Sequence, residues 1–504
     1  EEEERGRAGR KKQSSILGAS FNFTNSIIGA GIIGIPAAIR LAGFVPGVIL
    51  LVLVAVITDY TVLLLIKNGI ISNKFSYQEM ITEAFGRPGF WVLTITQLLF
   101  PFLATAGYVV IVGDTFSRII EEFFVVAGTE PLAWVINTSV IKTATIILIM
   151  LPLSLLRNIA MLEKFSALAV LFVTVIVLFT VAKAATYYCS VRCFLPSCCD
   201  TPISIWVINT HFIESVGIMA FAFVCHHNTY LIYGSLLRRS YTRFSAVSHM
   251  SVSGSAVFCT VLGLAGFLSF MNATKGDLLN NYCVDDWVAT VARFLYACVI
   301  MLTFPIEIFV CREVLEIVLS RLPYRVISWV RQGRVKRALS RFLFSPRHSS
   351  LPRHVILTLV LVLFSLGVGL TTDDLSIVLG FNGCLMATPM AFILPTASYL
   401  RLTRGGRSHW YSRDRLIAWA VMVFGVIVMV IGTALSIEQA VQSFSHRGTS
   451  RLAYCPDTSS AHQSLSTCCS LIDSTVNLTL HVPLCDCSSF CHNSSILTSP
   501  DLYC

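Results

Sequence analysis

Eleven long apolar segments, separated by polar loops, dominate this chain of 504 residues. Each is close to the roughly 20 apolar residues that an α-helix needs to cross about 30 Å of hydrocarbon. Most are apolar on every side, whereas a helix of a soluble bundle has a polar face. The sequence therefore predicts an all-α integral membrane protein with about eleven transmembrane helices. The segments lie near residues 16–39, 45–67, 91–117, 140–156, 164–186, 210–236, 245–271, 287–311, 354–371, 375–400 and 415–437.

The composition excludes most soluble classes of protein. Only 13% of the residues are charged and 55% are hydrophobic, whereas a soluble domain carries about 25% charged residues. A soluble enzyme, a disordered protein and a small disulfide-rich secreted module are therefore excluded as the main body of the chain. The net charge of +9 is typical of basic cytoplasmic loops. We expect the lipid bilayer, and no nucleic acid, as a partner.

Short motifs of common enzymes are missing from the sequence. It contains no His-Glu-x-x-His zinc motif, no Gly-x-Ser-x-Gly elbow and no Walker loop. We therefore expect neither enzymatic activity nor an organic cofactor. The sequence leaves the oligomeric state open and is compatible with a monomer.

The distribution of lysine and arginine predicts the orientation in the membrane. With a cytoplasmic N-terminus, 28 of the 37 basic residues fall in cytoplasmic segments, 8 fall outside, and Arg293 lies within a span. Cytoplasmic loops carry such an excess of basic residues. The candidate glycosylation sites Asn272, Asn477 and Asn493 then lie outside. The plasma membrane and the lysosomal membrane share this topology, so the sequence leaves the location open between them.

Cysteines gather on the predicted outer side. Twelve of the seventeen lie there, in an environment where disulfides persist. The disulfide candidates are Cys189, Cys193, Cys198, Cys199 and Cys283, and a bridge from the cluster at 189–199 to Cys283 would join two outer loops. The sequence does not choose the partner. A zinc site fits less well, because the cluster lacks paired ligand spacing.

The two ends differ from the middle of the chain. Residues 1–13 form a charged cytoplasmic tail, and its basic run enters the first span without a cleavage pattern, so no cleavable signal peptide is expected. Residues 14–437 are the expected transmembrane domain. Residues 438–504 are rich in Ser, Thr and Cys and form an extracellular or lumenal tail that cannot build a core by itself.

Two of the spans carry helix-breaking residues at matching places. The first contains Gly29, Gly31 and Gly34, and the sixth contains a polar island at 225–229. Spans 1–5 and 6–10 would form two repeats of inverted topology, and such paired interruptions point to a transporter site. Unwound backbone offers N–H groups to a carboxylate and carbonyls to a small cation. The alternative is that the glycines form a close-packing face.

Three stretches resemble one family of transporters. Asn22–Pro36, Phe221–Tyr233 and Leu302–Pro305 are similar to the first, sixth and eighth helices of the sodium-coupled neutral amino acid transporters, in the amino acid/auxin permease group. The resemblance covers roughly residues 14–437. It implies a LeuT-like fold of five plus five helices in inverted repeat, with one extra helix, and transport by alternating access.

The resemblance also implies roles for individual residues. Asn25 and Thr303 fall where the family's sodium ligands lie, and both offer hard neutral oxygens; alternatively, the Thr303 hydroxyl bonds to its own helix. The glycine N–H groups would bind the substrate carboxylate, and two rings would line the side-chain pocket, although both could be ordinary core aromatics. These residues are Gly29, Gly31, Gly34, Phe221 and Phe223.

The sixth span departs from the family pattern, and some spans contain ionisable groups. Where the family has proline after the first histidine, this chain has His227, which leaves substrate preference and gating open. Charges within a bilayer are costly and usually have a reason. Asp59, His226, His227 and Glu307 are therefore candidates for proton coupling, and structural hydrogen bonds between helices are the alternative.

We therefore expect a secondary active transporter of small neutral L-amino acids, coupled to sodium, with proton antiport as an open feature. A first alternative is a proton-driven or uncoupled amino acid transporter. A second is an amino acid sensor with little flux, although the short N-terminal tail offers little surface for a signalling partner.

Overall fold

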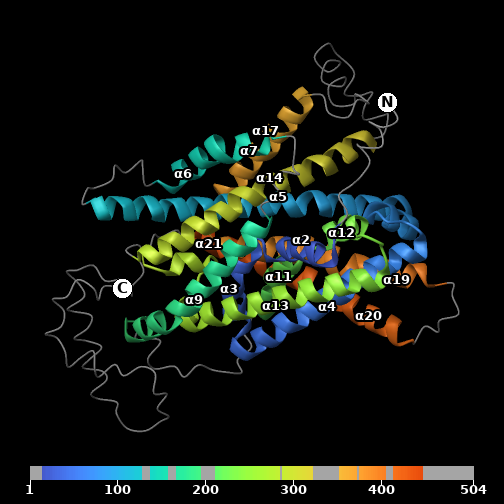
Figure 1. Ribbon diagram of the computed structural model, residues 1–504, viewed down its shortest axis with the longest axis horizontal. Helices are drawn as coiled ribbons and strands as arrows, with labels where there is room; N and C mark the ends of the chain where they lie inside the picture. The colour runs from blue at the N-terminus through green and yellow to red at the C-terminus, as the bar shows by residue number, and fades with distance from the viewer. Residues whose placement is uncertain are drawn as a thin grey trace, which may run out of the picture.

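The computed structural model describes residues 14–127, 137–156, 166–194, 211–283, 286–321, 351–371, 374–404 and 412–445. Nearly all of them are helical, and the only β-type pairing within these ranges is an isolated bridge between Ser14 and Leu236. Figure 1 shows long helices such as α4, α5 and α13 running in roughly the same direction through the molecule.

The first half of the chain, up to the end of α9, contains three long helices and several shorter ones. In chain order they are α2 (Ile16–Ile28), η1 (Ala30–Gly34), α3 (Ile35–Ala42), α4 (Phe44–Ser72), α5 (Tyr77–Ala127), α6 (Thr138–Thr145), η2 (Ile146–Met150), α7 (Leu151–Ser154) and α9 (Ser166–Phe194).

The second half begins with a helix that is interrupted near its middle. Its elements are α11 (Phe212–Phe223), η3 (His226–Asn228), α12 (Thr229–Ser235), α13 (Tyr241–Phe270), η4 (Met271–Ala273), η5 (Leu278–Asn281), α14 (Trp287–Arg321), α17 (Leu351–Gly369), α18 (Leu375–Asn382), η6 (Gly383–Ala387), η7 (Pro389–Ile393), α19 (Leu394–Leu402), α20 (Arg413–Ile427), η8 (Val428–Gly432) and α21 (Thr433–Ser445).

These helices match the eleven expected segments one by one. Nine described helices are long and apolar enough to cross a membrane. The expected first span is a bent pair, Ile16–Ile28 and Gly31–Ala42, with 47° between its parts, and the expected fourth is the shorter helix Thr138–Ser154. The all-α membrane fold is therefore confirmed with nine to ten spans, while the eleventh span and the inverted repeat stay predictions.

The third span is longer than expected. Its apolar stretch begins near residue 91, but α5 already starts at Tyr77 and is kinked at Gly86, which has φ 67° and ψ −154°. A residue with a side chain rarely adopts this positive φ. Pro88 follows two residues later. The sequence Gly-Arg-Pro is typical of a loop, but in the structure the chain is helical on both sides of the kink.

Helix α11 lies in the interior of the molecule. Every residue from Glu214 to Phe223 is buried, and the helix packs against α3, α4, α18, η6 and η8. By contrast, α20 on the periphery exposes large apolar side chains such as Leu416 and Trp419. Such side chains suit a lipid-facing surface, because a spanning helix needs no polar face toward hydrocarbon.

Two glycines allow α11 and η6 to touch backbone to backbone. A Cβ atom at Gly383 would lie only 1.8 Å from the carbonyl oxygen of Gly217, and one at Gly217 would lie 2.2 Å from Cys384 Sγ. The first of these neighbours is backbone, so a methyl group at Gly383 would force the two elements apart. Small residues at such contacts are typical of packed membrane helices.

We expect Gly383→Ala to lower the stability of the folded protein by about 1–3 kcal/mol, the usual cost of overpacking. The matched control is Gly254→Ala in α13, where a Cβ atom would meet nothing within 4 Å. This change should be neutral or stabilising by up to about 1 kcal/mol, because alanine favours the helix. Thermal unfolding of the two variants in detergent measures the difference, and equal midpoints would contradict the packing argument.

Candidate functional site

The first broken helix is interrupted where the sequence places its glycines. Helix α2 ends at Ile28, Gly29 has the non-helical values φ −43° and ψ −146°, and a short 3-10 turn leads into α3. Pro36 stands in the first turn of α3, where its missing N–H costs nothing because that N–H has no helical partner. The prediction of an unwound first span is therefore confirmed at the level of the backbone.

The second broken helix is interrupted at the polar island. Helix α11 ends at Phe223, Val224 is extended with φ −72° and ψ 113°, and His226–Asn228 form a single 3-10 turn before α12 begins. His226 is fully buried, and its Nε2 lies 2.9 Å from Thr61 Oγ1 of α4. Polar groups freed by the break are thus surrounded by protein rather than lipid.

The two interruptions meet each other. A Cβ atom at Gly31 would lie 2.5 Å from the Cα atom of Ala222, so only glycine lets η1 approach α11 this closely. A second link joins the two breaks, because Asn228 Nδ2 donates a hydrogen bond of 2.8 Å to Ser26 Oγ of α2. The sequence-predicted pair of broken spans therefore forms one continuous region in the centre of the molecule.

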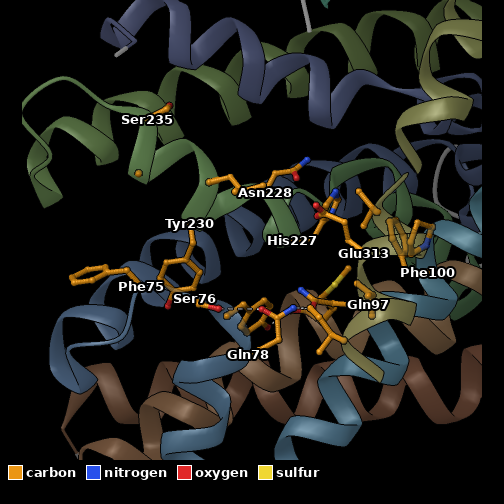
Figure 2. Close-up of a pocket in the computed structure, with 18 of the residues that line it drawn as sticks. Phe75, Ser76, Gln78, Gln97, Phe100, His227, Asn228, Tyr230, Ser235 and Glu313 are labelled. Carbon is orange, nitrogen blue, oxygen red and sulfur yellow. Dashed lines mark hydrogen bonds between the residues drawn. The ribbon is translucent and has the colours of Figure 1, made fainter. Parts of the chain in front are cut away.

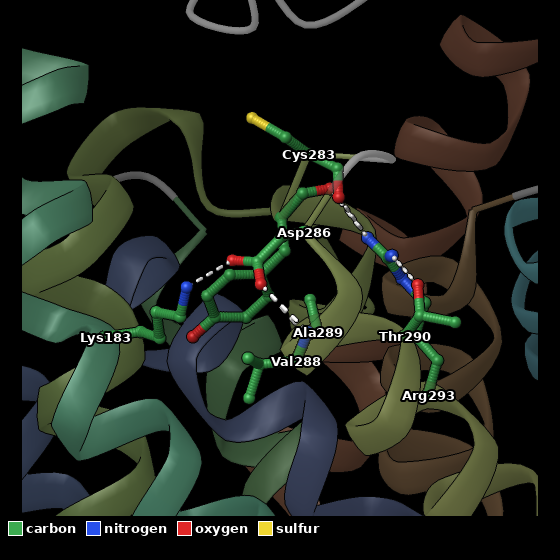
Figure 3. A network of polar contacts seen from close by, with 8 residues as sticks. Lys183, Cys283, Asp286, Val288, Ala289, Thr290 and Arg293 are labelled. Atoms are coloured by element: carbon green, nitrogen blue, oxygen red, sulfur yellow. Dashed lines mark hydrogen bonds and ion pairs between the residues drawn. The ribbon is translucent and has the colours of Figure 1, made fainter. Parts of the chain in front are cut away.

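The connection between α13 and α14, described as far as residue 283, covers this region on the predicted outer side. It is called the outer loop below. Figure 3 shows how Arg293 of α14 holds the end of that loop. Its Nη2 donates to the carbonyl oxygens of Leu279, Tyr282 and Cys283 at 3.2, 2.7 and 3.2 Å. The Arg293 side chain is fully buried. One buried guanidinium thereby supplies a hydrogen-bond donor to three backbone carbonyls of the loop.

The loop reaches the first break itself. A Cβ atom at Gly276 would lie 2.4 Å from both N and Oγ of Ser376 at the start of α18, and one at Gly34 would lie 3.8 Å from the Gly276 carbonyl oxygen. Leu278 packs against Gly266 of α13 in the same way. The outer end of the broken region is therefore closed by direct contact.

A cavity of about 1250 Å³ opens at the opposite end. It is lined by the α4–α5 connection, by η3 and α12, by the last turns of α14 and by parts of α5 (Figure 2). Its polar groups are partly engaged: Gln78 Nε2 donates to Gln97 Oε1, and Tyr230 OH donates to the Leu65 carbonyl oxygen at 2.6 Å. The mouth lies at the end that the basic residues predict as cytoplasmic.

Phe100 of α5 lies between the cavity and Phe221 of α11. Its ring centroid lies 5.5 Å from that of Phe221 on one side and 5.8 Å from that of His227 on the other. Phe100 and His227 line the cavity, whereas Phe221 is not among its lining residues. The ring of Phe100 therefore stands between the open cavity and the expected substrate site.

The expected substrate residues lie together behind Phe100. Phe221 and Phe223 are buried in α11, and Gly31 contacts that helix directly. Gly29 precedes this contact and Gly34 faces Leu379 and Ile218. The structure therefore brings the five expected substrate residues into one region. Their role in binding stays a prediction.

The two expected sodium ligands stand on different helices, and their role as a pair stays a prediction. Asn25 is half-buried in α2, which packs on α9 and α13, whereas Thr303 lies in α14, which packs mainly on α5, α9 and α17. The Thr303 hydroxyl donates to the carbonyl oxygens of Val299 and Ile300 at 3.0 and 3.2 Å. This is the alternative considered from the sequence, and it leaves the lone pairs of the oxygen available.

The four candidates for proton coupling occupy different surroundings. Asp59 accepts a hydrogen bond from Ser248 and lies 2.7 Å from Nδ1 of the exposed His249, so it sits near the periphery. His226 is tied to Thr61, while His227 faces the cavity. Glu307 has a buried Oε2 without a hydrogen-bond partner in the described structure, and Nδ1 of His226 and Nδ1 of His227 are likewise buried without one.

The structure describes only some of the outer features expected from the sequence. Cys283 is disulfide-bonded, but the side chains of Cys189, Cys193, Cys198 and Cys199 lie outside the described residues, so the pairing stays a prediction. Asn272 is exposed in η4, as a glycosylation site requires. Asn477 and Asn493 lie outside the described residues.

Sequence reasoning missed two residues that organise the site. Phe100 gave no signal, because one aromatic in an apolar span is ordinary and only tertiary packing places it between Phe221 and His227. Arg293 gave a signal as a charge within a span, and charges at such positions usually have a structural or functional partner. Its partners are loop carbonyls, which could not be read from the sequence.

Asp277 in the outer loop is the most unusual ionisable group outside the membrane-spanning helices. Burial raises the pKa of its carboxyl to about 6, against smaller lowering effects from the Leu279 N–H, Arg293, Arg118 and Lys275. Its Oδ1 accepts from the Leu279 N–H, while its Oδ2 is buried without a partner in the described structure. The closed loop therefore favours the protonated carboxyl.

We expect the closed loop to become more stable as the pH falls through about 6. The exposed carboxyl of an open loop has its ordinary, lower pKa, so protons bind preferentially to the closed form. Hydrogen-exchange protection factors of residues 276–283, corrected for the intrinsic pH dependence of amide exchange, should be larger at pH 5 than at pH 7. Asp277→Asn, which keeps the acceptor for the Leu279 N–H, should remove most of this difference, and an unchanged pH dependence would contradict the assignment.

Comparison with known proteins agrees with this architecture. The family model described as "Transmembrane amino acid transporter protein" matches residues 12–438. A Danio rerio protein described as "Putative sodium-coupled neutral amino acid transporter 11" is 38% identical over 426 residues, which cover 84% of this chain and 87% of the relative. Its Mus musculus counterpart is 35% identical over 84% of this chain and 85% of its own length.

A more distant relative broadens the comparison. "Vacuolar amino acid transporter 2" of Saccharomyces cerevisiae is 31% identical over 432 residues, or 85% of each chain. The family match extends from before α2 into α21, and these relatives cover more than four fifths of the chain. The chain therefore belongs to the transmembrane amino acid transporter family and is a multi-pass membrane protein, not an enzyme.

Proposed function

We propose that this protein moves small neutral L-amino acids across a membrane by sodium-coupled alternating access. The observation that carries the proposal is the meeting of two broken helices at Gly31 and Ala222, with a cavity that approaches this region from the end where the basic residues gather. Exposed backbone N–H groups at such a break suit the substrate carboxylate, and freed carbonyls suit a cation. Several relatives are described by name as sodium-coupled neutral amino acid transporters.

The conformation corresponds to one half of an alternating-access cycle. The outer loop contacts the first break at Gly34 and Gly276, while the inner cavity reaches as far as Phe100. If the basic residues lie in the cytoplasm, this is an inward-facing state with Phe100 as the last barrier. An outward-facing state then requires the outer loop to withdraw and the inner walls to close.

Sodium is the proposed coupling ion, with Asn25 and Thr303 as its side-chain ligands. One sodium ion that moves through about 100 mV releases about 2.3 kcal/mol, which supports roughly 50-fold accumulation of a neutral substrate. The Thr303 hydroxyl donates its proton to the helix backbone, so its oxygen can still accept a cation.

We expect labelled neutral amino acids to enter proteoliposomes when an inward sodium gradient is imposed, and not when choline replaces sodium. Asn25→Ala and Thr303→Ala should each lower this sodium-dependent uptake about tenfold or more, as loss of a supporting group does at other metal sites. Thr303→Ser keeps the hydroxyl and should retain most of the uptake. Asn22→Ala, at an exposed position of α2, is the matched control, and a loss as large as that of Asn25→Ala would count against a specific sodium ligand.

A second candidate function is amino acid transport driven by protons. Glu307 favours it, because its carboxyl has a buried oxygen without a partner and lies near Tyr108 of α5. A buried carboxyl with unsatisfied bonding capacity can exchange a proton without breaking a structural bond. His227, with an unpartnered Nδ1 beside the cavity, could deliver that proton.

If protons drive transport, uptake should follow an imposed pH gradient and be indifferent to the replacement of sodium by choline. Glu307→Gln should then abolish the response to the pH gradient, because an amide cannot exchange a proton. Glu79→Gln, the same substitution at an exposed position of α5, should leave the response intact. Sodium-dependent uptake that survives in Glu307→Gln would instead favour the first proposal.

A further inference from the structure

The start of the first span is tied to the inner end of the sixth. Ser14 N donates to the Ser235 carbonyl oxygen at 2.8 Å, and Leu237 N donates to the Ser14 carbonyl oxygen at 3.1 Å. These two bonds form the isolated bridge between Ser14 and Leu236. We name this pairing of residues 14–15 with residues 235–239 the inner latch.

The inner latch stands at the mouth of the cavity. Ser235, Leu236 and Arg239 all line the cavity, and the exposed Arg238 lies next to them. Two backbone hydrogen bonds therefore tie this wall of the mouth to the described start of the N-terminal segment. Such bonds contribute about 1 kcal/mol each, so a single new charge interaction would change the strength of the latch considerably.

Ser15 has the surroundings of a phosphate acceptor. Its side chain is exposed, its backbone is extended with φ −67° and ψ 167°, and its Oγ accepts a hydrogen bond from Gly18 N at 3.1 Å. The three basic residues Arg10, Lys11 and Lys12 precede it closely in the sequence. Some protein kinases prefer serines that closely follow basic residues in the sequence.

We propose that Ser15 is a phosphorylation site that regulates the inner latch. A protein kinase would transfer the terminal phosphoryl group of ATP to Ser15 Oγ: the new O–P bond forms as the bond to ADP breaks, and the hydroxyl proton leaves to solvent. The inference rests on the proposed function in one respect, because ATP and kinases reach residue 15 only if this end of the protein is cytoplasmic.

The phosphate would strengthen the latch through charge. It carries about −1.5 to −2 charges and three acceptor oxygens. Arg238 and Arg239 follow directly after Leu237, which is bonded to Ser14, so both arginines are within a few residues of the new charge. Paired with them, the phosphate would fix residues 235–239 to the N-terminal segment and hinder the closure of the cavity mouth that each transport cycle needs.

The test uses the full-length chain, phosphorylated in detergent with ATP and a kinase that prefers basic sequences, and then reconstituted in liposomes. Mass spectrometry should locate phosphate on Ser15. Uptake of a labelled neutral amino acid should fall about fivefold, the factor that corresponds to about 1 kcal/mol in a barrier. Hydrogen exchange of residues 235–239 should become slower, and this second readout does not depend on flux.

Three variants make the result specific. Ser15→Asn cannot be phosphorylated but keeps a good N-cap for α2, so kinase treatment should leave its uptake and its hydrogen exchange unchanged. Ser14→Ala should still respond. Arg238→Gln combined with Arg239→Gln should still accept phosphate on Ser15 but lose the effect, when each sample is compared with its own untreated control.

Several results would overturn the proposal. These are an absence of phosphate on Ser15 in the treated chain, and phosphate on Ser15 that changes neither uptake nor hydrogen exchange. A phosphate effect that persists in Ser15→Asn would assign the regulation elsewhere. A failure of the proposed transport function would show as an absence of uptake in the untreated chain, and hydrogen exchange would then still decide whether the latch responds.

Discussion

A helix can be interrupted inside a bilayer only where protein replaces lipid around the freed peptide groups, since hydrocarbon offers them no hydrogen bonds. The rest of this structure depends on that constraint. Helix α11 is buried on every side, and the break that follows it is enclosed by α4, α5 and the first span. Gly31 brings the first break into contact with α11. The two interrupted backbone segments thus pack against one another at the centre of the bundle.

The same constraint explains what could be predicted from the sequence. The apolar segments and both interruptions are local properties: glycines at 29, 31 and 34 weaken a helix, and a polar island such as 225–229 cannot face lipid. These features are sufficient to predict an all-α membrane protein with two special spans. The family resemblance agreed with them because the family's motifs are the same local features.

Features that depend on tertiary contacts could not be predicted. Phe100 resembles any other aromatic of an apolar span, and only the packing of α5 beside α11 places it between Phe221 and His227. Asp59 looked deep in its span, but α13 brings the exposed His249 to it. Asp277 read as a loop residue in water, yet the loop folds inward and buries it. The burial and the pairing of a polar side chain depend on contacts between helices, which are not visible in the sequence of one helix.

The inner cavity also shapes the electric field across the protein. A volume of about 1250 Å³ is many times that of a water molecule, whose share of liquid volume is about 30 Å³, so the cavity has room for the solution at its mouth and its ions as far as Phe100. Charged groups beside conducting solution experience little of the transmembrane voltage. Most of that voltage therefore falls across the packed layer between Phe100 and the outer loop, which is thinner than the membrane itself. An ion that crosses this layer is driven by nearly the full potential over a short distance, and the steepest field coincides with the two broken helices.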